Sequence, residues 1–167
     1  VVTASLDKTA RVWLLADGSL VRTLEGHTDA VNSACVSPDG QHVVTASRDK
    51  TARLWDGESG AARQTFEGHT HIVRSVDCVV VAGELRVVTG SWDKTARVWG
   101  ERGALLTLEH AAEVRSVAGV VAGDAWRVVS GDWSGAVQVW DGASGAMLSA
   151  LDGHEGVVYS LAVHKMD

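Results

Sequence analysis

The hydrophobic positions of this chain fall in short runs that are separated by turn-forming residues. VVTAS and ARLW are typical runs: both are rich in β-branched or aromatic residues, and a tight RDKT turn joins them. DGESGA and DGASGA have the Gly, Asp and Ser that hairpin turns favour. No stretch keeps a helical period over about ten residues. The pattern therefore predicts an all-β chain of many short strands.

One string recurs along the chain and divides it into units. VVTASLDKTARVW at 1–13 returns as VVTASRDKTARLW at 43–55 and VVTGSWDKTARVW at 87–99, and a diverged copy, VVSGDWSGAVQVW, lies at 128–140. Successive copies start 42, 44 and 41 residues apart, a period typical of propellers and other repeat arrays. We predict one domain over 1–167 with four short strands per unit, the units being 1–42, 43–86, 87–127 and 128–167.

Composition narrows the class of protein. Hydrophobic residues make up 46% of the 167 residues, which excludes a disordered chain, and a net charge of −6 argues against a nucleic-acid binder. The apolar runs are too short to cross a bilayer, so no membrane association is expected. Two lone thiols, Cys35 and Cys78, and the lack of a glycosylation sequon predict an intracellular, cytoplasmic protein.

Repeated Gly-His and Trp-Asp pairs give the strongest motif. They occur in order at the repeat period, with the DKTAR turns between them: Gly26-His27, Gly68-His69 and Gly153-His154, and Trp55-Asp56 and Trp140-Asp141. Over the whole chain these residues resemble the WD-repeat β-propeller family. The resemblance implies blades of four antiparallel strands that run outward from a central channel, with each sequence repeat spanning two neighbouring blades.

The resemblance also implies a structural network in each blade. A buried Trp indole, a Ser or Thr hydroxyl, the His of Gly-His and a turn Asp would form one hydrogen-bonded chain. In this sequence the sets are His27, Ser47, Asp49 and Trp55, and then His69, Ser91, Asp93 and Trp99. A third set departs from the pattern, with His110 after Glu109, Asp132 in the place of Ser and Ser134 in the place of Asp, so that the two groups have exchanged roles or the network is broken.

The two ends of the chain hold complementary parts of a fourth set. Ser5, Asp7 and Trp13 lack only a His, whereas His154 lacks the other three. The tail VVYSLAVHKMD aligns with AVNSACVSPDG, an inner strand and its turn. We therefore expect the last inner strand, about 157–163, to complete the blade begun by residues 1–25, within one ring or in a partner chain. The alternatives are a small closed ring, a homodimer that shares one propeller, and a fragment of a larger propeller.

Residues that vary on the repeated frame point to a binding face. In a propeller, the residue before the turn Asp and the residue after the first Val of the inner strand lie around the channel mouth. The first set of positions holds Leu6, Arg48, Trp92 and Trp133, and the second holds Asn32, Arg74, Arg115 and Tyr159. Arg and aromatic residues are enriched in binding hot spots, and on an acidic protein they suggest an acidic or phosphorylated peptide. A cationic side chain among the aromatics, or mere packing of the Trp residues against the next blade, are the alternatives.

No catalytic or metal-binding motif accompanies this frame. The Ser, His and Asp of the network have a repeated structural role and do not predict a nucleophilic triad. No His lies at ligand spacing from Cys or carboxylates, and no phosphate loop occurs, so we expect no metal and no cofactor. The sequence thus predicts a non-enzymatic scaffold for protein–protein interaction. The alternatives are a structural part of a larger propeller or multidomain protein without its own site, and a propeller enzyme such as a hydrolase.

Overall fold

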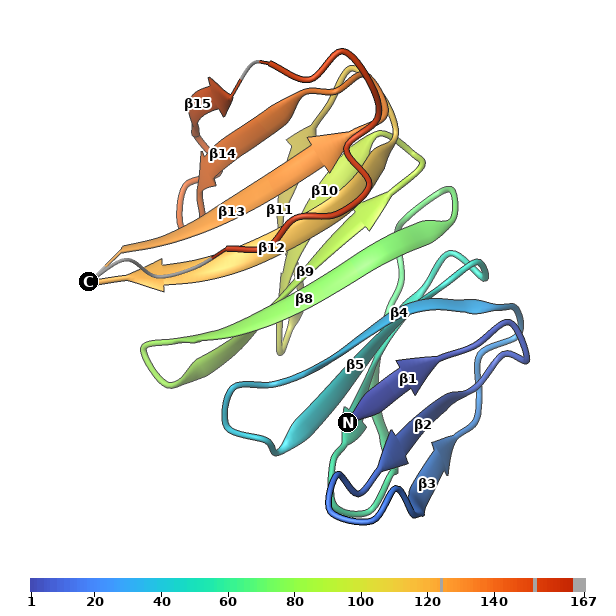
Figure 1. The fold of residues 1–167 in the computed structure, drawn as a ribbon. Helices are drawn as coiled ribbons and strands as arrows, with labels where there is room; N and C mark the ends of the chain where they lie inside the picture. Colours follow the sequence, from blue (N-terminus) through green and yellow to red (C-terminus); the bar gives the residue numbers. More distant parts are fainter. Residues whose placement is uncertain (124, 152, 164–167) are drawn as a thin grey trace.

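Four antiparallel sheets, arranged as an arc, make up the fold in the computed structural model, which describes residues 1–123, 125–151 and 153–163 (Figure 1). The regular elements of these described residues are all strands. The first sheet holds β1 (Val2–Ala4), β2 (Ala10–Trp13) and β3 (Leu20–Leu24), and the second holds β4 (Val31–Val36), β5 (His42–Ser47), β6 (Ala52–Asp56) and β7 (Ala62–Phe66). The third holds β8 (Val73–Val81), β9 (Glu84–Ser91), β10 (Thr95–Gly100) and β11 (Gly103–Glu109), and the fourth holds β12 (Val114–Ala122), β13 (Ala125–Asp132), β14 (Val137–Asp141) and β15 (Met147–Leu151). The predicted all-β propeller architecture is confirmed.

Tight turns that join β1 to β2, β5 to β6 and β9 to β10 explain the recurring DKT string. The turn Asp caps its own turn: Asp49 Oδ1 accepts hydrogen bonds from Thr51 N (3.0 Å) and Thr51 Oγ1 (2.7 Å). The next residue adopts a left-handed conformation, with a φ of 71° at Lys50. Gly135 occupies the corresponding place in the diverged fourth unit, with a φ of 94°, where a residue without Cβ is favoured.

Inner strands of neighbouring sheets lie side by side and are joined by hydrogen bonds (Figure 1). Ser33 Oγ on β4 accepts a hydrogen bond from the Val76 amide on β8 (3.4 Å), and Ser75 Oγ accepts one from the Val117 amide on β12 (3.2 Å). The amides of Val76 and Val117 lie at the free edges of their sheets, where no neighbouring strand of the described residues offers a backbone acceptor. The Ser hydroxyls supply that acceptor instead. The inner strands therefore form a connected wall from which the sheets radiate.

The core consists of layers between successive sheets. The ends of the first three outer strands are each buried beside the Trp of the next sheet: Leu24 packs in one cluster with Trp55, Phe66 with Trp99, and Leu108 with Trp140. The ring centroids of Phe66 and Trp99 are 5.5 Å apart. At the corresponding position of the fourth sheet, Leu151 is 53% exposed, because no described sheet follows it.

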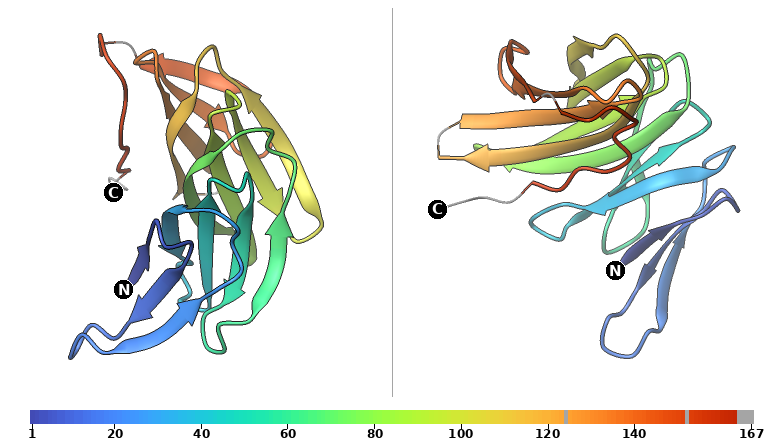
Figure 2. Two further views of the ribbon diagram at one scale, coloured as in Figure 1. Left: turned by 90° about the vertical axis from the view of Figure 1, so that its right-hand side faces the viewer. Right: turned by 45° about the horizontal axis from the view of Figure 1, so that its top comes forward.

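The tail does not complete the first sheet, so this prediction is wrong within a single chain. Residues 157–163 form no strand, and their contacts are with the fourth sheet: the Val158 amide donates to Asp132 O (3.2 Å) and the Leu161 amide to Ser116 Oγ (3.0 Å). Val158 is buried above Gly131. The tail thus covers the nearby apolar face of the fourth sheet, whereas the first sheet lies at the other end of the arc (Figures 1 and 2).

Candidate functional site

A buried chain of hydrogen bonds links the loop before β4 to the turn after β5. Trp55 Nε1 donates to Thr45 Oγ1 (2.8 Å), which is also 2.7 Å from His27 Nε2. The other ring nitrogen, Nδ1 of His27, lies 2.7 Å from Asp49 Oδ2. If His27 is neutral, the Thr45 hydroxyl donates its hydrogen to Nε2, and the imidazole donates its Nδ1 hydrogen to the carboxylate. Every polar atom of this buried set then has a partner.

The hydroxyl in this chain is not the one that we predicted from the sequence. Ser47 instead donates to Ala30 O (2.9 Å) and accepts from the Asp49 amide (3.1 Å). In the β5–β6 register Trp55 lies opposite Val43, so Thr45 is two residues from that pair and Ser47 is four. Only the nearer hydroxyl is within reach of the indole.

The same correction applies to the third sheet. Trp99 Nε1 donates to Thr89 Oγ1 (2.8 Å), and His69 lies 2.7 Å from both Thr89 Oγ1 and Asp93 Oδ2. Ser91 Oγ donates to the carbonyl of His71 (3.2 Å) instead. The second and third sheets therefore contain the same Trp–Thr–His–Asp chain.

The two turn carboxylates of these chains are held ionised. Burial by itself would raise the pKa of Asp49 and Asp93, but hydrogen bonds from His27 and Thr51, and from His69 and Thr95, outweigh it. The pKa of both carboxyl groups lies well below the ordinary Asp range. The chains therefore stabilise the fold at neutral pH, and their contribution is lost only in acid, as these carboxylates become protonated.

The fourth sheet keeps part of the chain. Trp140 Nε1 donates to Ser130 Oγ (2.9 Å), which is 2.7 Å from His110 Nε2. His110 Nδ1 lies 3.0 Å from the carbonyl of Leu108, and Asp132 caps the following turn rather than binding the imidazole. The exchange of roles between Asp132 and Ser134, one of the two alternatives from the sequence, is therefore not seen. Neither side chain binds His110, and the carbonyl of Leu108 takes the place that a carboxylate has in the other sheets. Burial lowers the pKa of His110, so the ring is neutral at pH 7.

No His of the described residues joins the hydrogen-bonded chain of the first sheet. Trp13 Nε1 donates to Thr3 Oγ1 (2.8 Å), whereas Ser5 Oγ accepts from the Asp7 amide (3.2 Å). His154 is exposed, and its carbonyl oxygen lies beside Gly135 of the fourth sheet, 2.6 Å from where a Cβ of that glycine would stand. The prediction that His154 joins Ser5, Asp7 and Trp13 is therefore wrong within one chain, because the tail follows the fourth sheet.

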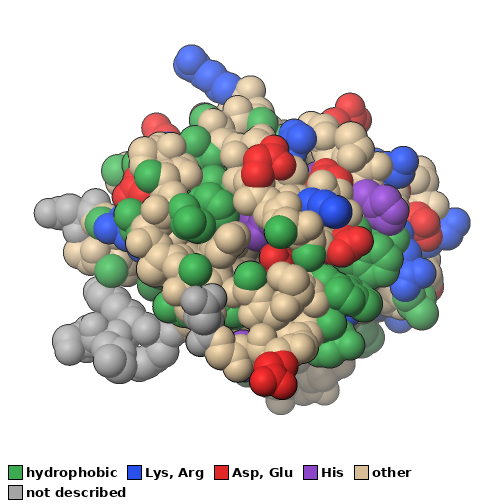
Figure 3. Space-filling view, turned by 90° about the horizontal axis from the view of Figure 1, so that it is seen from above, with side chains coloured by type: hydrophobic (Ala, Val, Ile, Leu, Met, Phe, Trp, Pro, Cys, Tyr) green, Lys and Arg blue, Asp and Glu red, His purple; other side chains and the backbone are tan. Residues whose placement is uncertain are grey.

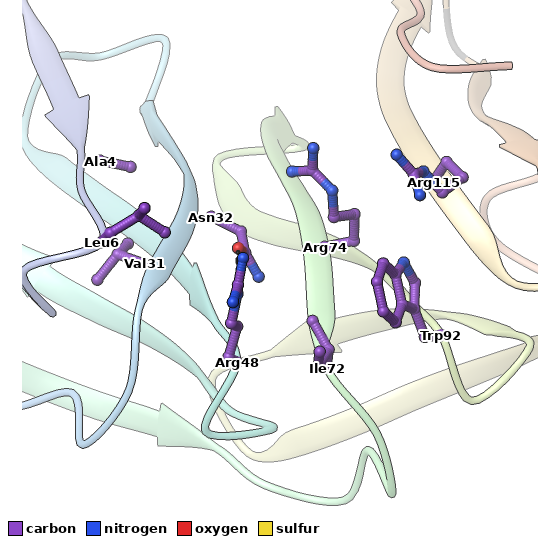
Figure 4. A pocket seen from close by; sticks show the side chains of 9 residues that line it. All are labelled: Ala4, Leu6, Val31, Asn32, Arg48, Ile72, Arg74, Trp92 and Arg115. Carbon is purple, nitrogen blue, oxygen red and sulfur yellow. Dashed lines mark hydrogen bonds between the residues drawn. The ribbon is translucent and has the colours of Figure 1, made fainter.

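A hollow of 430 Å³ opens at the ends of the inner strands (Figure 4). Five residues of the predicted binding face line it, together with four apolar residues. The five are Asn32, Arg48, Arg74, Trp92 and Arg115, and the apolar ones are Ala4, Leu6, Val31 and Ile72. Leu6 occupies one of the varying turn positions, whereas Ala4, Val31 and Ile72 are ordinary strand or strand-entry residues that no sequence signal distinguishes.

The hollow is cationic although the protein is acidic overall. Its lining contains three Arg and no Asp or Glu, and none of these Arg side chains forms an ion pair with any other described residue. Burial, and next the charges of Arg115 and Arg48, lower the pKa of Arg74. Acidic and basic side chains are interspersed on the surface that Figure 3 shows. The arginine cluster is thus a local concentration of positive charge.

Asn32 positions one of these cations. Its Nδ2 donates to the carbonyl of Val73 on the neighbouring sheet (3.0 Å), and its Oδ1 accepts a long hydrogen bond from Arg48 Nε (3.4 Å). Figure 4 shows the Arg48 and Asn32 side chains together, with Arg74 on the next inner strand. The terminal nitrogens of Arg48 remain available for a ligand.

Arg115 stands in an aromatic cluster formed by the remaining predicted residues. Its guanidinium carbon is 4.7 Å from the ring centre of Trp133, 4.9 Å from that of Tyr159 and 5.7 Å from that of Trp92. These distances are typical of cation–π contacts. A second hollow, of 230 Å³, lies between Trp92, Glu113 and Trp133. Glu113 was not predicted as part of the binding face. Its only distinguishing feature in the sequence is that it comes one residue before an inner strand.

No described residues suggest a metal centre or a membrane helix. Within residues 1–123, 125–151 and 153–163, no three His, Cys, Asp or Glu side chains are grouped so that they could hold a metal ion. The same part of the chain contains no helix that is long and apolar enough to span a bilayer.

Radiating antiparallel sheets with a His-centred chain at their turns define the class of β-propeller repeat proteins. The family model described as WD domain, G-beta repeat, matches residues 18–56, 60–100 and 103–141. These matches cover most of the chain, so the protein belongs to the WD-repeat family. Each match includes the outer strand of one sheet and the first three strands of the next. WD-repeat proteins are generally scaffolds for protein interaction and are typically non-enzymatic.

Proposed function

We propose that this chain is a non-enzymatic interaction module whose arginine-lined hollow binds an acidic or phosphorylated peptide of a protein partner. One observation carries the proposal: Arg48, Arg74 and Arg115 converge on one hollow that has no acidic residue in its lining. Burial, together with the like charges of Arg115 and Arg48, lowers the pKa of Arg74, so its cation is disfavoured without a counter-charge in the hollow. An anionic ligand would relieve this repulsion and accept several charge-assisted hydrogen bonds.

The three arginines are not equivalent in this role. Arg48 is exposed and oriented by Asn32, and Arg74 is half-buried on the neighbouring strand. Arg115 lies against three aromatic rings, and these cation–π contacts already hold its charge. We therefore propose that Arg48 and Arg74 are the main contacts to the anion, and that Arg115 mainly holds the aromatic side chains around it in place.

We expect the double variant Arg48→Gln, Arg74→Gln to lose about tenfold or more in affinity for phosphopeptides, because each hydrogen bond to a charged group contributes roughly 1.5–3 kcal/mol. The probe is a degenerate peptide library with a central phosphoserine, immobilised on beads, and retained sequences are then measured by fluorescence anisotropy. Arg63→Gln is the matched control, since Arg63 is an exposed arginine on β7 that pairs with Asp56. Retention of no peptide, or equal binding by wild type and the double variant, would contradict the proposal.

A second proposal concerns self-association into a shared propeller. The apolar pairs Leu24–Trp55, Phe66–Trp99 and Leu108–Trp140 are buried between successive sheets. Leu151 at the end of the fourth sheet is exposed, and Trp13 in the first sheet is less buried than its equivalents. Two copies would bury both groups if the fourth sheet of one packs on the first sheet of the other, an arrangement that closes after two such contacts.

We expect light scattering of the purified chain to give twice the 17.6 kDa mass of one chain. Leu151→Asp should shift the protein to the mass of a single chain, because it places a charge in the proposed contact. Leu148→Asp is the control, since Leu148 lies on the same strand and is also exposed. A single-chain mass for the wild type would disprove the shared propeller without affecting the arginine hollow.

A further inference from the structure

The two cysteines lie on neighbouring inner strands and their sulfur atoms are in contact. Cys35 is on β4 and Cys78 is on β8, and the Sγ–Sγ distance is 3.3 Å. Both side chains pack in the same core cluster, in which Cys78 is 5% exposed and Cys35 is partly buried. One thiol donates a weak hydrogen bond to the other, so the pair faces itself rather than solvent.

The frame around the pair keeps the two strands together. Asn32 and Ser33 of β4 bind the main chain of β8 at Val73 and Val76, on the channel-mouth side of the two cysteines. A disulfide requires a sulfur separation of about 2.05 Å, so the sulfurs need to approach by little more than about 1 Å. Rotation about the Cα–Cβ bonds, with small strand adjustments, can provide such a movement.

We propose that Cys35 and Cys78 are a site of reversible oxidation, where exchange with a small-molecule disulfide such as oxidised glutathione forms a bond between the second and third sheets. In the first step the Cys35 thiolate attacks one sulfur of the small disulfide, giving a mixed disulfide and releasing one thiolate. The Cys78 thiolate then attacks the Cys35 sulfur and releases the second. The protein loses two protons and two electrons, and the small disulfide takes them up to become two thiols.

Exposure sets the order of the two steps. Cys35 is the more accessible sulfur and therefore enters the mixed disulfide, whereas the buried Cys78 resolves it. The hydrogen bond with Cys78, followed by burial, raises the pKa of the Cys35 thiol, so the thiolate is scarce at neutral pH and exchange is slow. A slow exchange delays the equilibrium between the reduced and the disulfide-bonded protein but does not change its position.

The bond would act on the strands that carry the arginine hollow. Asn32 lies three residues before Cys35 on β4, and Arg74 lies four residues before Cys78 on β8. A covalent link between these strands fixes their separation at the hollow. The oxidation itself does not rest on peptide binding, so its test is independent of the proposed function.

The experiment equilibrates the full chain in glutathione buffers of increasing oxidised fraction, followed by acid quenching, alkylation and intact mass spectrometry. We expect a single-chain species that has lost two hydrogens and takes up no alkylating reagent, with Cys35 linked to Cys78 in the peptide map. Its melting temperature should exceed that of the reduced chain by about 5 °C or more, since the bond closes a long loop in the unfolded state.

Two single variants serve as controls. Cys35→Ser and Cys78→Ser each leave one thiol, so each can gain at most one glutathione and its melting temperature should not rise with the oxidised fraction. A wild-type chain that stays reduced in the most oxidising buffer, that carries only mixed glutathione disulfides, or that links only to other chains would overturn the proposal. The wild-type measurement alone decides this, even where a variant folds poorly.

Discussion

His69→Ala is expected to lower the free energy of unfolding by about 3–5 kcal/mol, whereas His154→Ala should change it by less than about 0.5 kcal/mol. His69 is buried between Thr89 and the ionised Asp93, so its removal leaves a buried carboxylate and a hydroxyl without their partner. His154 follows a glycine just as His69 does, but it is exposed. The two substitutions therefore compare the same Gly-His motif in a buried and in an exposed position.

Urea unfolding at pH 7, followed by Trp fluorescence, measures the difference. Similar losses for the two variants would show that the tail binds the Ser5–Trp13 turn, in the same chain or in a partner, and not only the fourth sheet. The measurement needs to be repeated at several protein concentrations, because an intermolecular contact would make the effect of His154→Ala depend on concentration.

Thr89→Val is expected to destabilise the protein by about 2–4 kcal/mol, because a methyl group replaces the oxygen that two buried ring nitrogens share. Trp99 Nε1 would lose its acceptor and His69 Nε2 its partner, while the volume and β-branched shape of the side chain are kept. Thr89→Ser retains the hydroxyl and should cost less than about 1.5 kcal/mol, mainly through the lost methyl group.

Thermal and urea unfolding of the two Thr89 variants, beside wild type, test this assignment. Comparable stability of Thr89→Val and Thr89→Ser would mean that the hydroxyl is not the link between indole and imidazole. A double-mutant cycle with Trp99→Phe adds a second check, because the loss on removing the hydroxyl should shrink once the indole donor is absent.

The sheets could be predicted from the sequence because the repeat places the same β-forming strings at a constant period. The choice between Thr45 and Ser47 could not, since residues two apart on a strand share a face and both carry hydroxyls. Only the β5–β6 register, with Trp55 opposite Val43, decides between them. A motif thus defines which residue types meet, whereas the strand register defines which of two candidates makes the contact.

In the candidate site, too, the repeat predicted which residues share a face, whereas the contacts between strands could not be predicted. The varying positions on the repeated frame sufficed to predict the arginines and aromatic residues around the hollow, because the frame sets which positions share a face. The contact between Cys35 and Cys78 was not predicted, since in the aligned repeats Cys35 corresponds to Asp77. Neighbouring inner strands are staggered by one residue relative to this alignment, as the Ser33–Val76 bond also shows, and the stagger brings the two sulfurs together.

All strand pairs in the four sheets join strands that are consecutive in the sequence. Chain closure for each pair spans only a short loop, so the entropy lost in forming it is small for a β protein. Each sheet can form as its own hairpins emerge, and the outer strand of one sheet is already in place when the next sheet packs against it. We therefore expect rapid, sheet-by-sheet folding, in which a slow phase would report the docking of sheets rather than the formation of strands.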